Sequence, residues 1–240
     1  MEYIAIKTRV MQPPQDDLFA MLEEYLTDVN DGDIVLITSK IVSIHQGRCI
    51  PLGTVEKRDL VEQEADYLLD SKDKLTESPL AIVHHSLFYA AGIDESNADG
   101  HYVLLPKKPF DIAEEIWHYI REKFNLKNVG VILTDSHSQP LRIGAIGISL
   151  AWWGFHPIES HTYKKDLFDR PIHFSVTNIV DALAGGSAVV CGETNESTPI
   201  ILARSVPNLV FTNQDTRHEV FKSRKEDIYY PLLKPFYNKE

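Results

Sequence analysis

The chain has 240 residues, enough for one large domain or two small ones, and its 43% hydrophobic and 25% charged residues exclude a wholly disordered protein. A formal net charge of −11 without a dense Lys/Arg cluster argues against partners such as nucleic acid or an anionic membrane surface. Two cysteines exclude a disulfide scaffold, and the chain shows neither a signal peptide nor the roughly 20 apolar residues of a membrane span, so we expect a cytoplasmic protein.

The first 92 residues contain a mixture of predicted strands and helices. β-Branched alternation predicts a strand near residues 3 to 10, and the spacing of Leu18, Leu22 and Leu26 predicts a helix over 16–26. The run IVLITS is typical of a buried strand. We further expect a helix over 57–72 and strands over 80–85 and 87–92.

The rest of the chain continues this mixed pattern. The stripe Ile112, Ile116, Ile120 and Phe124 behind Pro109 predicts the clearest helix. The remaining predictions are a buried strand over 129–134 that ends at Asp135, a packed glycine-rich segment over 143–155, strands over 172–180, 199–204 and 208–212, a small-residue helix over 180–192 and a short helix within 223–233. Because strands and helices do not alternate strictly, we predict an α+β (mixed α/β) fold.

Three acidic residues share one sequence context. Asp94, Asp135 and Glu193 each follow an apolar segment and sit among small polar residues. Hard cations such as magnesium take oxygen ligands, typically one or two carboxylates together with phosphate oxygens. The three side chains either converge on such a cation or are ordinary turn and capping residues.

Four motifs in fixed order favour the first interpretation. SKIVSIHQGR (39–48), AGIDESN (91–97), VGVILTDSHSQPLRIG (129–144) and GETNESTP (192–199) resemble the motif series of the γ-glutamyl ligases that add glutamate to the precursor of the deazaflavin coenzyme F420. The resemblance covers about residues 1–205, which we expect to form one ligase-like domain with an extension over 206–240 packed on it.

The resemblance implies a GTP-dependent ligase that uses two divalent cations, Mg²⁺ or Mn²⁺, and joins L-glutamate to an acidic acceptor through an acyl phosphate. It places one cation on Asp94 and Asp135 and the other on Ser136 and Glu193. It also implies a homodimer. The implied nucleotide-binding residues are Lys7, Thr8, Arg9, Val10, Ser39, Lys40, Asn97, Cys191, Gly192, Thr194, Asn195, Glu196, Ser197 and Thr198.

Two positions depart from the family pattern. Ile44 stands where the family commonly has a lysine, and Gln139 where it often has an arginine. These departures leave the acceptor open between a deazaflavin, a pterin-like molecule and another acid. Candidate substrate contacts are Arg142, His137, Trp152 and Trp153, although the two tryptophans fit a core or a dimer interface equally well.

Two other functions remain open. A metal-dependent phosphatase or nucleotidyl-transfer enzyme on the same scaffold would keep the carboxylates but would not recognise glutamate. A nucleotide- or metal-binding homologue without catalysis would keep the binding residues alone.

Overall fold

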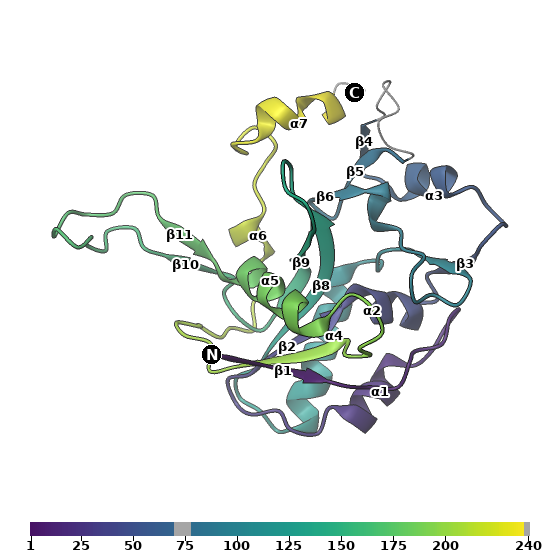
Figure 1. The fold of residues 1–240 in the computed structure, drawn as a ribbon. Coiled ribbons are helices and arrows are strands. Elements are labelled where there is room, and N and C mark those ends of the chain that lie inside the picture. The colour runs from purple at the N-terminus through teal and green to yellow at the C-terminus, as the bar shows by residue number, and fades with distance from the viewer. Residues whose placement is uncertain (70–77, 238–240) are drawn as a thin grey trace.

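A computed structural model describes residues 1–69 and 78–237 of the chain (Figure 1). The mixed α/β class predicted from the sequence is confirmed. In chain order the elements are β1 (Glu2–Ile6), α1 (Leu18–Tyr25), β2 (Ile34–Thr38), α2 (Ser39–His45), β3 (Cys49–Pro51), α3 (Lys57–Glu64), β4 (Tyr67–Leu69), β5 (Leu80–Val83), β6 (Ser86–Tyr89), the 3₁₀ turn η1 (Ala90–Gly92), β7 (His101–Val103), α4 (Pro109–Lys123), β8 (Gly130–Ser138), β9 (Ala145–Trp153), β10 (Ile158–Ser160), β11 (Val176–Asn178), α5 (Ile179–Cys191), β12 (Ile200–Arg204), α6 (Arg217–Val220) and α7 (Tyr230–Tyr237).

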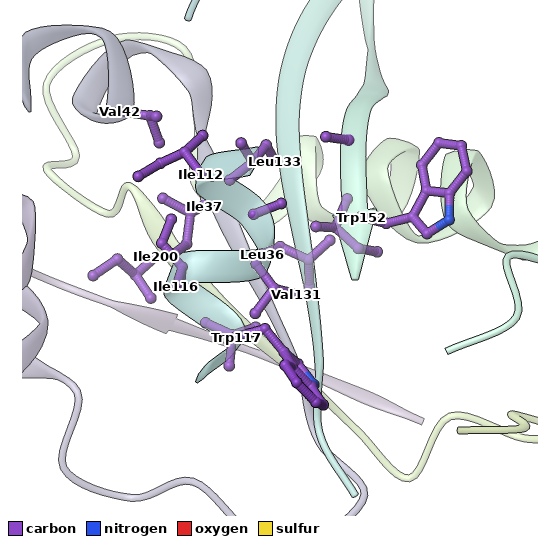
Figure 2. Packing of buried hydrophobic residues seen from close by; sticks show 14 of the residues in the cluster. Leu36, Ile37, Val42, Ile112, Ile116, Trp117, Val131, Leu133, Trp152 and Ile200 are labelled. Carbon is purple, nitrogen blue, oxygen red and sulfur yellow. The ribbon is translucent and has the colours of Figure 1, made fainter. Parts of the chain in front are cut away.

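A five-stranded sheet in the order β1-β12-β2-β8-β9 forms the centre of the fold. Its single parallel pair is β2 with β8, and the other neighbours are antiparallel. The strands β2 and β12 are almost continuously apolar because both faces of the sheet are covered. The helices α4 and α5 both pack on this sheet. Figure 2 shows part of the resulting core, with Ile112 and Ile116 of α4 near Leu36 of β2 and Val131 of β8.

A second, smaller core lies around the three-stranded sheet β4-β5-β6. Leu60 and Val61 of α3 are buried there with Phe88 of β6. Leu150 of β9 belongs to the same cluster, so the long hairpin β8–β9 connects the two cores. Smaller two-stranded sheets pair β3 with β7 and β10 with β11, and the latter pair forms an arm that projects from the molecule (Figure 1).

Several predicted elements need correction. The helix expected over 57–72 ends at Glu64, and Tyr67–Leu69 is a strand instead; residues 70–72 lie outside the described residues. The strand expected over 208–212 is reduced to one isolated bridge between Phe155 and Phe211. The strand expected over 172–180 shrinks to β11, because Asn178 caps α5 by accepting from the backbone N–H of Asp181.

The first part of the segment after residue 205 packs on the main core, whereas α7 contacts β4 of the smaller sheet. Thr216 is buried, and its hydroxyl accepts from Trp152 Nε1 at 2.9 Å and lies 3.2 Å from the carbonyl of Phe155, to which it donates. Phe221 packs against the rings of Phe110 and Trp152. Within the part of the chain that the structure describes, no helix is long and apolar enough to cross a membrane.

Glycine at position 147 allows α5 to approach the sheet. A Cβ on Gly147 would lie 2.1 Å from the carbonyl oxygen of Ala184 in α5, closer than atoms can pack. The facing Gly185 has room, because its own Cβ would lie 3.8 Å from the carbonyl of Gly147. Close packing at this point therefore depends on a bare backbone in the strand.

We expect Gly147→Ala to lower the free energy of unfolding by about 1–3 kcal/mol, because the added methyl group must push α5 off β9. The matched control Gly185→Ala should be neutral or stabilising by up to about 1 kcal/mol, because alanine is the better helix former. Chemical denaturation of both variants measures the difference. Equal losses in the two variants would contradict this packing explanation.

Candidate functional site

The carboxyl ends of the parallel strands β2 and β8 bring two of the sequence motifs together. Thr38 lies opposite Thr134 in the parallel register, so the next residues, Ser39 and Asp135, also meet. Ser39 Oγ donates to Asp135 Oδ2 at 2.5 Å. Carboxyl ends of parallel strands are a common position for ligand sites. Contrary to our prediction, β8 does not end at Asp135 but continues to Ser138, pairing with β9 beyond a register shift at Leu133 and Thr134.

A cavity of about 340 Å³ opens at this edge of the sheet, within the size range of small-ligand pockets. Its wall is built from the segment after β1, from α2, the AGIDESN turn, β7, the end of β8, α5 and the loop before β12. Most of the predicted site residues line it: Thr8, Arg9, Val10, Ser39, Lys40, Asp94, Asn97, Asp135, Ser136 and Cys191 to Thr198.

Asp94 is held in the cavity wall by its backbone and its carboxylate. Its N–H and C=O both pair with Val103, at 3.0 and 2.8 Å. Its carboxylate accepts from Ser96 N at 2.9 Å and is ion-paired with Lys40 Nζ at 2.5 Å. Burial alone would raise the pKa of Asp94, but the hydrogen bonds from Lys40 and Ser96 outweigh it and the net pKa is lowered. Asp94 is therefore an anion at neutral pH.

The turn that leads into Asp94 has an unusual backbone. Ala90, Ala91 and Gly92 have φ values of 50°, 53° and 71°. The left-handed conformation costs an L-residue roughly 1–2 kcal/mol, and such conformations concentrate at functional sites. Glycine is favoured at the third position, because a Cβ on Gly92 would lie 3.0 Å from the side chain of Leu105 in addition to the unfavourable φ.

Asp135 is the most perturbed carboxylate in the cavity. Desolvation by burial raises its pKa to about 6, and the nearby charge of Asp94 adds to the rise, while the hydrogen bonds from Ser39 and the backbone N–H of Ser136 oppose it. A carboxylate that is poorly solvated and close to a second carboxylate favours a bound cation.

The GETNESTP loop closes the cavity from the side of α5. Gly192 has φ 76°, a backbone conformation that favours glycine, and a Cβ there would displace the side chain of Glu196, whose Cδ would lie 2.4 Å away. The carboxylate of Glu196 accepts from Thr194 N at 2.8 Å. Three hydrogen bonds fix the loop to other segments: Thr8 N donates to Ser197 O at 2.8 Å, Thr38 N donates to Pro199 O at 3.0 Å and Asn97 Nδ2 donates to Thr194 O at 2.7 Å.

Five predicted site residues lie outside the cavity wall. Lys7 is exposed beside it, and Arg142 is exposed in the turn between β8 and β9. His137 packs edge-on against Phe88, with ring centroids 6.5 Å apart. Trp152 and Trp153 are buried at 1% and 7% exposure within the main core, so the packing interpretation of the two tryptophans is correct and substrate contact through them is not.

The carboxylates do not form a cluster of three. Among residues 1–69 and 78–237, no group of three or more His, Cys, Asp and Glu side chains is placed so that it could hold a metal ion. Asp94 and Asp135 lie near each other, whereas Glu193 is exposed on the loop after α5. Two carboxylates and the hydroxyl of Ser136 are a donor set that suits a hard divalent cation whose other ligands are water or phosphate oxygens.

Part of the cavity wall was not predicted from the sequence. Ala184, Ser187 and Ala188 of α5 line it, as do Ser43 and Ile44 of α2. The small-residue composition of 180–192 indicated close packing but not the partner. Ser43 lies inside the quoted motif SKIVSIHQGR, yet nothing in the sequence assigned it a contact.

Comparison with known proteins gives one consistent result. A family model described as F420-0:gamma-glutamyl ligase matches residues 5–205. The coenzyme F420:L-glutamate ligase of Methanococcus maripaludis strain C7 is 29% identical over 245 residues, covering 95% of this chain and 97% of that protein. Proteins of the same name from Methanocaldococcus jannaschii (29% over 230 residues, 90% of each chain) and from Halobacterium salinarum strain R1 (28% over 244 residues, 91% of each chain) are also similar.

We expect Asp135→Asn to stabilise the protein without ligands at pH 7 to 8. The folded-state pKa of Asp135, about 6, lies above the ordinary value of 3.8, so the folded protein binds this proton more tightly than the unfolded chain does. The stability of wild type therefore falls as pH rises from about 4 through 6. The variant has no such proton and should gain at most about 3 kcal/mol at pH 8.

Thermal denaturation of both proteins between pH 4 and 8, with a chelator present, measures this effect. The difference should shrink towards pH 4. A wild-type advantage that grows with pH would contradict the assignment of a desolvated carboxylate.

Proposed function

Because the chain belongs to the F420-0:gamma-glutamyl ligase family, we propose that it joins L-glutamate to a carboxylate acceptor in a γ-glutamyl-type amide bond, at the expense of GTP. The curated relatives named above are ligases of coenzyme F420 and L-glutamate by name. F420-0 is accordingly the acceptor we propose first, although Ile44 and Gln139 depart from the family pattern.

One observation carries the proposal. The segments Lys7–Val10, SKIVSIHQGR, AGIDESN, the end of β8 and GETNESTP, which are far apart in sequence, all contribute residues to one cavity. The contacts Ser39–Asp135, Asn97–Thr194 and Thr8–Ser197 each join two of these segments. The segments that the family resemblance assigns to binding therefore meet at one site, as the ligase reaction requires.

The chemistry begins with the acceptor carboxylate. One of its oxygens attacks the γ-phosphorus of GTP, the bond to the β-phosphate oxygen breaks, and GDP leaves. The amino group of glutamate then attacks the carbonyl carbon of the acyl phosphate, phosphate leaves, and the amine proton passes to solvent or to a basic group. Catalysis of such a transfer is mainly positioning and charge neutralisation.

We assign Asp94, Asp135 and the hydroxyl of Ser136 to divalent-cation binding, with Glu193 as a further ligand if its loop moves inward. Magnesium or manganese would neutralise phosphate charge and orient the transferred group. Two such ions, as the resemblance implies, would need phosphate and water oxygens to complete their coordination. Ser39 is a positioning residue, because its hydroxyl fixes the carboxylate of Asp135.

Lys40 would change partners in this scheme. In the structure its ammonium group lies 2.5 Å from the carboxylate of Asp94 and 2.9 Å from Ser96 O. A divalent cation on Asp94 would compete for the same oxygens and would free Lys40 to contact a phosphate. The lysine therefore keeps Asp94 neutralised until nucleotide and cation arrive together.

A homodimer is part of the proposal. The arm between β10 and β11 and the hairpin turn of β8–β9 carry large apolar side chains that are exposed in a single chain. Exposed apolar surface of this kind is typical of protein–protein interfaces. The residues are Leu141, Ile143, Tyr163, Leu167, Phe168 and Phe174.

We expect GDP and phosphate release from GTP to require Mg²⁺ or Mn²⁺, L-glutamate and F420-0 together, with one glutamate-extended product detected by mass spectrometry for each GDP released. Omission of each component in turn, and replacement of GTP by ATP, is the test. Nucleotide hydrolysis without glutamate and acceptor would favour a phosphatase or nucleotidyl-transfer enzyme. Tight nucleotide binding without turnover under every condition would indicate a binding homologue.

We expect Asp94→Asn to reduce this turnover by at least about 100-fold, because an amide is a poor ligand for a hard cation. The neighbouring Glu95→Gln is the matched control. Glu95 is ion-paired with Lys57 at 2.8 Å rather than with Lys40, and it does not line the cavity. The turnover of the Glu95→Gln variant should therefore stay within about threefold of wild type. Steady-state assays with saturating Mg²⁺ compare the two. Equal losses would mean that the turn, rather than the cation site, was disturbed.

A further inference from the structure

Ser43 carries a buried hydroxyl group that the protein itself leaves unsatisfied. The residue is 1% exposed, and within residues 1–69 and 78–237 its Oγ has no hydrogen-bond partner. Buried polar groups in folded proteins are nearly always paired, so each exception needs an explanation. Ser43 lines the cavity, and this position offers an explanation, namely that the hydrogen-bond partner of its hydroxyl belongs to a ligand.

The helix α2 presents Ser43 to the same space as Ser39. The two serines are four residues apart and so lie on one helical face, about 6 Å apart along the axis. Ser39 uses its hydroxyl to hold Asp135 at the carboxylate part of the cavity. Val42, on another face of the helix, belongs to the main core (Figure 2). A ligand extending along α2 from the carboxylates would therefore reach Ser43.

The cavity wall also has apolar residues from α2 and β7. Ile44 of α2, Val103 of β7 and the following Leu104 and Leu105 line the cavity, and all four are less than 5% exposed. Pockets that bind planar rings combine apolar walls with a few polar groups that fix the orientation. Ile44 makes the wall more apolar, since the lysine that the family commonly has at this position would bring a charge.

We propose that Ser43 is a specificity-determining residue whose hydroxyl hydrogen-bonds the polar edge of a planar nitrogen heterocycle held between α2 and β7. The inference rests on the function proposed above, in which two ligands carry such a ring: the nucleotide, through its base, and a deazaflavin acceptor. The charged parts of either ligand would lie towards Asp94 and Asp135.

The chain contains a matched control for this hydroxyl. Ser187 of α5 also lines the cavity and is 2% exposed, but its Oγ donates to Ala184 O at 2.8 Å within its own helix. Ser43→Ala removes a group that has no partner in the protein, whereas Ser187→Ala removes one that is already satisfied. Only the first should change ring binding.

Titration calorimetry with Mg²⁺ would compare wild type, Ser43→Ala and Ser187→Ala against GTP, inorganic tripolyphosphate and F420-0. We expect Ser43→Ala to weaken GTP or F420-0 by about five- to tenfold, the effect of one lost hydrogen bond. The ligand that weakens identifies the ring. Tripolyphosphate, which has no ring, should bind equally to all three proteins. In turnover assays KM for the affected ligand should rise while kcat stays unchanged.

The melting temperature separates this role from a structural one. Ser43→Ala should melt at or above the temperature of wild type, since no internal hydrogen bond is lost. A lower melting temperature with uniform weakening of all three ligands would overturn the inference, as would unchanged affinity for both GTP and F420-0. In those cases the ligase proposal still stands. Failure of wild type to bind any of the three ligands would contradict both the role of Ser43 and the ligase proposal.

Discussion

The site depends on the parallel pairing of β2 with β8. This pair is the one place in the central sheet where two carboxyl ends lie side by side, and it puts Ser39 against Asp135 across the strand boundary. The antiparallel partners on either side then fix where the flanking segments go. The chain leaves β1 and enters β12 at the same edge, so Thr8 meets Ser197 and Thr38 meets Pro199 through backbone hydrogen bonds. The cavity wall is a consequence of strand order rather than of any single motif.

Several residues in or next to the cavity have an energetically unfavourable local structure. Ala90 and Ala91 adopt left-handed conformations, Asp135 is desolvated beside a second carboxylate, and Ser43 has an unsatisfied hydroxyl. Each feature costs stability in the absence of ligand and lies in or next to the cavity. The large buried core of the five-stranded sheet offsets these costs, and α5 packs closely on β9 at Gly147.

Periodicity and motif order predicted many of the long helices and strands, but not the short strands that form through pairing with distant parts of the chain. The stripe Ile112, Ile116 and Ile120 gave α4 within a few residues, and buried apolar runs gave β2 and β12, because a local pattern decides these elements. Residues 67–69 follow a helical pattern in sequence yet pair with β5, since tertiary contacts override weak propensity. The short strands β3, β7 and β10 went unpredicted for the same reason: each is three residues long and exists through its partner.

The two departures from the family pattern have different meanings in the structure. Gln139 sits near the exposed turn of the β8–β9 hairpin, 3.2 Å from the ring of His137 and outside the cavity wall, so the change from arginine alters a surface. Ile44 is buried in the cavity wall, so the change from lysine removes a positive charge from the cavity itself.

The loss at position 44 decides how phosphate charge must be balanced. Of the described residues that line the cavity, Arg9 and Lys40 are the basic ones, against the acidic Asp94, Asp135, Glu193 and Glu196. Arg9 forms two hydrogen bonds with Asp16, which hold the pKa of that carboxyl far below its usual range, so the guanidinium is already engaged. Lys40 alone cannot neutralise a triphosphate among four carboxylates. If a nucleotide binds here, most of its counter-charge must come from cations that the acidic side chains recruit, and the acidity of the cavity is then a requirement for binding rather than an obstacle to it.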